Sequence, residues 1–150
     1  MEFDSVDAVL DFAINNEQGA ADFYTELASK MEKPHMREVF EGFAAEEMGH
    51  KAKLETVKAG KRTKLSKAKV LDLKMAEYLV EEKPSASMDF QSALILAMKQ
   101  EKAAFRLYSD LAASTDDAEM RDLFLGLAQE EAKHKLRFEI EYDEGFLKEN

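Results

Sequence analysis

A gapless internal repeat is the feature that most restricts how these 150 residues can fold. When the sequence is compared with itself at a shift of 84 positions, 16 of the 43 residues from 13 to 55 match their counterparts. The register holds from the pair Glu17 and Glu101 to the pair His50 and His134. A duplicated unit is expected to fold in the same way twice, so equivalent residues should take equivalent places.

Each half reads as two helices that share an apolar face. Apolar residues recur at alternating steps of three and four, which is the spacing of the buried stripe of a helix in a bundle. Pro34 can open the second helix and Gly60 can end it. The residues "STDD" at 114–117 supply caps between the third and fourth helices.

A long connection separates the two halves. We expect one domain over residues 1–150, with helix pairs at 3–59 and 88–147 and a crossover at 60–87. The crossover begins with the basic stretch "KAGKRTKLSKAK", continues as a short helix over "VLDLKMAEYLVEE" and ends at "KPSAS". A connection of this length lets the second and third helices run parallel. The predicted fold is therefore all-α, a ferritin-like four-helix bundle with one long crossover.

Composition narrows the functional classes. The formal net charge of −10 argues against nucleic acid and anionic membranes as partners. The absence of Cys excludes disulfides, iron–sulfur clusters and thiolate zinc sites within these residues. The N-terminus is acidic, unlike a signal peptide, and the longest apolar run, "ALILAM", is far too short to span a bilayer. We expect a cytoplasmic location.

Six ionisable residues occupy positions on the apolar stripes, where a buried charge is costly. Residues three apart share a helix face, so the Glu and His of "EEMGH" and of "EEAKH" can point at one metal ion. No Lys or Arg stands on the stripes to balance the carboxylates, whereas two divalent cations would neutralise four of them. Such carboxylate and imidazole ligands suit Fe, Mn or Zn. The predicted metal ligands are Glu17, Glu47, His50, Glu101, Glu131 and His134.

Tyr24 and Tyr108 lie seven residues after the lone Glu of each half, on the same face. They are either ordinary core residues or hydroxyls that orient a ligand carboxylate. No catalytic residue is predicted beyond the metal ligands, and no organic cofactor site.

The segments "NEQGAADFYTELA" and "AAEEMGHK", repeated as "QEKAAFRLYSDLA" and "AQEEAKHK", resemble the ferritin-like domain of rubrerythrins. The resemblance covers nearly the whole chain and implies a di-iron site. It implies that Glu47 and Glu131 bridge the two ions, that Glu17 and Glu101 are terminal ligands, and that His50 and His134 each cap one ion.

Two departures from the rubrerythrin pattern change the expected chemistry. Without Cys there is no rubredoxin-like domain here, so electrons are expected from a separate donor such as a rubredoxin-like protein. Rubrerythrins also carry an extra Glu one turn after the third-helix ligand, where this chain has Ala103 and Ala104. That change weighs against efficient peroxidase activity and leaves ferroxidase or oxidase chemistry open. The short stretch after the fourth helix weighs against ferritin-type iron storage.

Three functions remain open from the sequence. The first is a di-iron oxidoreductase that reduces hydrogen peroxide or O2, a role in oxidative stress, with two iron ions that Mn or Zn can replace. The second is a non-catalytic protein for iron binding and handling. The third is a metal-free helical interaction module. The crossover has apolar residues that can cover the bundle or a second subunit, and we expect a homodimer.

Overall fold

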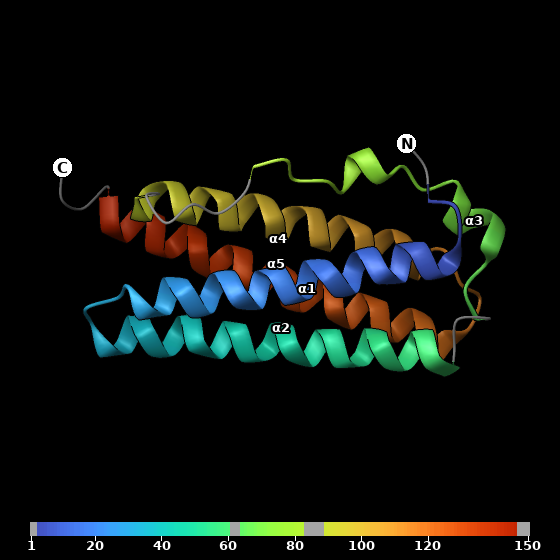
Figure 1. The fold of residues 1–150 in the computed structure, drawn as a ribbon, viewed down its shortest axis with the longest axis horizontal. Coiled ribbons are helices and arrows are strands. Elements are labelled where there is room, and N and C mark those ends of the chain that lie inside the picture. The colour runs from blue at the N-terminus through green and yellow to red at the C-terminus, as the bar shows by residue number, and fades with distance from the viewer. Residues whose placement is uncertain (1–2, 61–63, 83–88, 147–150) are drawn as a thin grey trace. The chain divides into compact units, whose positions relative to one another are not determined.

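A computed structural model describes residues 3–60, 64–82 and 89–146. Its internal contacts divide the chain into two compact units, with the boundary between Leu73 and Lys74. All elements found in the described residues are helices (Figure 1). Each unit contains one of the two predicted helix pairs.

The first unit holds α1 (Val6–Ser29), α2 (Pro34–Gly60) and the short α3 (Lys67–Leu71). α1 and α2 lie side by side and antiparallel, joined by a tight turn (Figure 1). Ser5 caps α1 by accepting a hydrogen bond from the backbone N–H of Ala8 at 2.9 Å. α2 begins at Pro34 and ends at Gly60, as the sequence predicts.

The second unit holds the 3₁₀ helix η2 (Met75–Glu77), α4 (Phe90–Ala112) and α5 (Ala118–Phe146). The Asp89 side chain caps α4 by accepting from the N–H of Ser92 at 2.8 Å. Asp117 does the same for α5, accepting from the N–H of Met120 at 2.9 Å. The predicted cap residues between these helices are therefore used.

The predicted stripes are the cores of the two helix pairs. On α1 and α2 they bury large side chains such as Leu10, Tyr24, Phe40 and Leu54. On α4 and α5 they bury Leu94, Tyr108, Leu111, Phe124 and Phe138. Burial of side chains of this size supplies most of the stabilising free energy of a helix pair.

The crossover differs from the prediction of one helix over 70–82. The helix there is α3, which ends at Leu71, and only one further turn forms, at η2. After η2 the side chain of Tyr78 is buried and donates a hydrogen bond from Oη to Oδ2 of Asp110 on α4, at 2.6 Å. Glu77 pairs with Arg106 at 3.3 Å. These contacts hold the segment against α4, so tertiary contacts override its helical pattern. The predicted crossover at 60–87 and the predicted second helix pair at 88–147 also include some residues that the structure does not describe. These are residues 61–63, 83–88 and 147.

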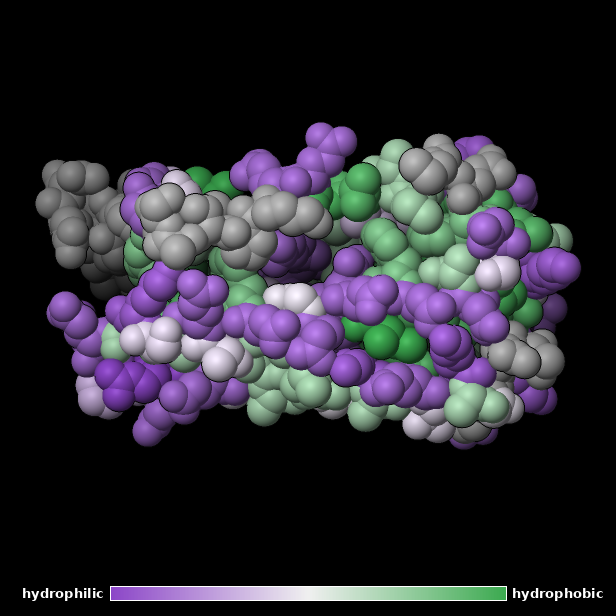
Figure 2. Space-filling model, in the orientation of Figure 1, coloured by the Kyte–Doolittle hydropathy of each residue, from purple (hydrophilic) through white to green (hydrophobic). Residues whose placement is uncertain are grey.

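The surface is mainly hydrophilic on the face that Figure 2 shows. The exposed large apolar residues within the described ranges include Met48 on α2, Phe105 on α4 and three residues of α5, Leu125, Leu136 and Ile140. No helix of the described residues is long and apolar enough to cross a bilayer.

Candidate metal centre

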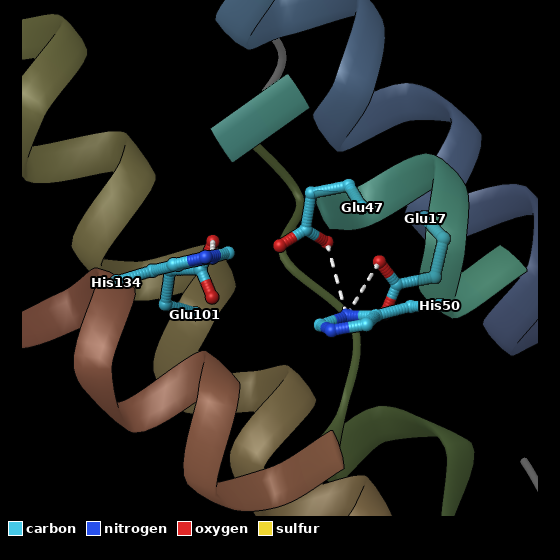
Figure 3. A network of polar contacts seen from close by, with 5 residues as sticks. All are labelled: Glu17, Glu47, His50, Glu101 and His134. Atoms are coloured by element: carbon cyan, nitrogen blue, oxygen red, sulfur yellow. Dashed lines mark ion pairs between the residues drawn. The ribbon is translucent and has the colours of Figure 1, made fainter. Parts of the chain in front are cut away.

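The first cluster lies in the middle of the α1 and α2 pair. Glu17 comes from α1, and Glu47 and His50 come from one face of α2 because they are three residues apart. His50 Nδ1 lies 3.6 Å from Oε2 of Glu17 and 4.0 Å from Oε2 of Glu47. Figure 3 shows these three side chains pointing toward one another. The predicted spacing therefore brings three potential ligands together.

The second cluster repeats this arrangement in the other unit. Glu101 comes from α4, and Glu131 and His134 come from α5. His134 Nδ1 lies 3.6 Å from Oε1 of Glu101, the same separation as in the first unit (Figure 3). Equivalent residues of the repeat thus take equivalent places within their helix pairs.

All six side chains are almost fully removed from solvent, with 1–2% of their surface exposed. In each cluster one donor atom of every residue lies within 4.8 Å of donor atoms of the other two. Buried carboxylates are normally found beside cations, and each cluster offers only two carboxylates and an imidazole. This donor set fits a divalent ion of the Fe, Mn or Zn type and gives each unit a candidate metal-binding cluster.

The two predicted tyrosines are buried in the same helix pairs. Tyr24 packs edge-on against Phe23 and Phe43, with ring centroids 5.7 and 6.3 Å away. Tyr108 stacks on Phe124 at 6.4 Å with an angle of 21° between the rings. These contacts establish a packing role, and the orientation of a ligand carboxylate by either hydroxyl stays a prediction.

The sequence did not predict the contact between two polar residues beside the first cluster. Lys51 follows His50, and its Nζ donates a hydrogen bond to Oε1 of Gln18, which follows Glu17, at 2.8 Å. Gln18 in turn donates from Nε2 to Oδ1 of Asp22 at 2.9 Å. The only signal in the sequence was that both Gln18 and Lys51 adjoin a predicted ligand.

The helical fold and the two buried clusters define a class, the ferritin-like carboxylate proteins. The model of the rubrerythrin family matches residues 8–142. The chain therefore belongs to the rubrerythrin family, which confirms the resemblance seen in the sequence.

Solved structures agree on the fold. The chain is similar to a protein from Thermotoga maritima described as a ferritin-like diiron-carboxylate protein, with a TM-score of 0.78 and 18% identity over 97% of this chain and 99% of that one. It is also similar to a hypothetical protein from Pyrococcus furiosus, with a TM-score of 0.70 and 25% identity over 93% and 89% of the two chains. The all-α, ferritin-like fold class is confirmed. A comparison with curated proteins gives no match.

Proposed function

We propose that the two clusters together hold two iron ions and that the protein is an oxidoreductase of rubrerythrin type. The observation that carries this proposal is the burial of two Glu and one His, twice, at equivalent points of two helix pairs. Membership of the rubrerythrin family supports iron as the metal. Mn and Zn are accepted by the same ligand types and are expected to substitute.

Charge balance supports a pair of ions. Four buried carboxylates carry four negative charges, and the stripes of the described helices bring no Lys or Arg among them. Two divalent cations neutralise this charge and offset the cost of removing the carboxylates from water. By resemblance to the family, Glu17 with His50 would hold one ion and Glu101 with His134 the other, and Glu47 and Glu131 would be ligands shared by both.

The proposed reaction is the reduction of hydrogen peroxide or O2. When bound, two Fe(II) ions supply the two electrons that convert one hydrogen peroxide, together with two protons, into two molecules of water. The protein holds the ligands in fixed positions, and the apolar side chains around them exclude bulk water. The electrons that restore Fe(II) come from a donor outside these residues, such as a rubredoxin-like protein, because the chain has no Cys of its own.

A second candidate is a non-catalytic iron-handling protein. It is favoured by the small side chains at Ala103 and Ala104, where rubrerythrins carry an additional Glu. A metal-free interaction module is the third candidate, and it does not explain why six ionisable side chains are buried. A homodimer and a cytoplasmic location complete the proposal.

The deciding experiment loads the protein with Fe(II) under anaerobic conditions, removes unbound metal and measures iron per chain. Glu47→Ala and His134→Ala should both lower the iron content. Matched controls are Glu55→Ala, an exposed carboxylate of the same helix as Glu47, and His35→Ala, an exposed imidazole. Both controls should keep wild-type iron.

The loaded protein is then mixed with hydrogen peroxide or with O2 in the presence of a reductant. Two irons per chain and repeated turnover support the oxidoreductase. Two irons without turnover support iron handling, and a chain without stoichiometric iron overturns the metal centre and leaves the interaction module.

A further inference from the structure

The two clusters have the same ligands but opposite charges beside them. On α1, the positions two before, one after and five after Glu17 hold Asn15, Gln18 and Asp22. At the same positions around Glu101, α4 holds three cations, Lys99, Lys102 and Arg106. The formal charge of these three side chains is thus −1 on α1 and +3 on α4, although the sequence repeat aligns the two segments without a gap.

A hydrogen-bonded relay joins the two helices at the first cluster. It runs from Lys51 on α2 through the amide of Gln18 to Asp22 on α1. Because Gln18 and Lys51 each follow a ligand directly, the relay ties together the two backbone segments that carry Glu17 and His50. A second bond between the same helices, from Lys58 Nζ to Oδ1 of Asp11 at 2.6 Å, lies two turns further along.

The second cluster has no such relay in the part of the chain that the structure describes. Lys135, the counterpart of Lys51, pairs along its own helix with Glu139 at 2.8 Å. Lys102, the counterpart of Gln18, is exposed, and the described residues give it no partner.

The other two cations of α4 are balanced by the crossover. Lys99 lies 2.5 Å from Oε1 of Glu82, and Arg106 lies 3.3 Å from Oε2 of Glu77. Of these three cations of α4, Lys102 is therefore the one whose positive charge no described ion pair balances. A cation next to a metal ligand opposes the binding of a metal ion, with a strength that solvent and salt reduce.

From these differences we propose that the two clusters bind metal with unequal affinity, and that Glu17, Glu47 and His50 take the first ion. The relay pre-organises this cluster, so less conformational freedom is lost on binding. At the second cluster, the positive charge of Lys102 beside the ligand Glu101 weakens the binding of the second ion. The inference rests on the proposed function, since it assigns an order of filling to that same centre.

Two reciprocal substitutions test the proposal. Lys102→Gln gives the second cluster the residue of the first, and Gln18→Lys does the reverse. Folding is expected to be unchanged in both variants because both positions lie toward the surface. The helical circular dichroism signal checks this. Lys30→Gln is the control, because it removes one positive charge at the far end of α1, where Lys30 pairs with Glu26.

Co(II) is the probe, titrated anaerobically and followed by its ligand-field absorption. The wild type should bind in two resolved steps. Lys102→Gln should tighten the second step roughly two- to fivefold, and Gln18→Lys should weaken the first by at least as much. About 1 M salt should remove most of the Lys102→Gln effect, which a purely structural change would not show. His50→Ala should remove the tight step and His134→Ala the weak one.

The possible failures are distinguishable. Two equal steps, or an effect of Lys102→Gln no larger than that of Lys30→Gln, would overturn the unequal clusters and leave the metal centre intact. Loss of the weak step in His50→Ala would reverse the assigned order and also overturn the inference. A wild type that binds no Co(II) would overturn the proposed function and the inference together.

Discussion

Nδ1 of His50 lies 3.6 Å from Oε2 of Glu17, although 33 residues separate them in the chain. The two residues lie at the same level of the helix pair, because the apolar stripe of each helix places one of them in the core. The equivalent pair, His134 and Glu101, has the same separation. The two helix pairs therefore bring their buried carboxylates and imidazoles together in the same way.

Replacing a buried carboxylate should stabilise the metal-free protein. In the presence of a chelator, Glu17→Leu is expected to raise the free energy of unfolding by about 1–3 kcal/mol, because it removes one of two neighbouring buried carboxylates, leaves Glu47 beside His50 and keeps the side-chain volume. Urea denaturation measures the change. Glu55→Leu at an exposed position of α2 is the control and should change it by about 0.5 kcal/mol or less. A less stable Glu17→Leu protein would contradict the proposed electrostatic cost.

Metal should stabilise the folded state through the same residues. At about 100 times its dissociation constant, a bound ion raises the free energy of unfolding by about 2.7 kcal/mol. Thermal unfolding with and without added Fe(II) or Mn(II) detects this as a higher midpoint. His134→Ala should reduce the shift and His35→Ala should preserve it. Equal shifts in the two variants would mean that the stabilising metal binds elsewhere.

The contact between Tyr78 and Asp110 should make stability fall at alkaline pH. Burial, together with the hydrogen bond to the Asp110 carboxylate, raises the pKa of Tyr78 well above its ordinary value of 10.0. Above about pH 10, Tyr78 ionises in the unfolded chain but not in the folded chain. The contribution of Tyr78 to the free energy of unfolding is therefore present below that pH and is lost as the pH rises further.

Tyr78→Phe tests this contact. The variant is expected to be less stable at neutral pH by about 1–2 kcal/mol, since it loses a hydrogen bond to a charged group. Its stability should then decline less between about pH 9 and about pH 11 than that of the wild type. Tyr142→Phe removes a hydroxyl bonded to Gln91 and serves as the comparison. An unchanged alkaline slope in Tyr78→Phe would rule out Tyr78 as its source.

The cap of α4 should weaken in acid. The hydrogen bond from the N–H of Ser92 lowers the pKa of Asp89, so the stabilising effect of the carboxylate charge is complete above the ordinary pKa of 3.8 and is lost as the pH falls through the lowered pKa. Asp89→Ala should lower the unfolding midpoint at neutral pH, and Asp89→Asn should largely retain it. Thermal unfolding from about pH 6 to about pH 2 should show the advantage of the wild type over Asp89→Ala shrinking toward that of Asp89→Asn. A constant difference between them would contradict the cap's ionisation.

Much of the helix pairs could be predicted because their stripes are periodic. The steps of three and four placed all six candidate ligands among buried residues, and Pro34 marked the start of α2. That these residues bind metal stays a prediction. Burial on α4 also extends beyond the predicted stripe to Leu96 and Leu107. A single period finds the strongest face of a helix and misses further faces that other neighbours cover.

The crossover and the relay could not be predicted for a different reason. Tyr78 and Asp110 are 32 positions apart, and nothing in their local sequences indicates that they meet. Gln18 and Lys51 look like ordinary surface residues of two helices, and their hydrogen bond depends on the rotation of both helices. Contacts between distant polar side chains leave no period in a sequence.

The boundary between Leu73 and Lys74 gives the chain a natural place to be divided. It precedes the crossover segment that pairs with α4, and it cuts none of the described helices. Each fragment would keep three of the six donors, with a helix pair to hold them. The chain is therefore suited to dissection at this point, with each half produced separately and tested for the binding of a metal ion by its own cluster.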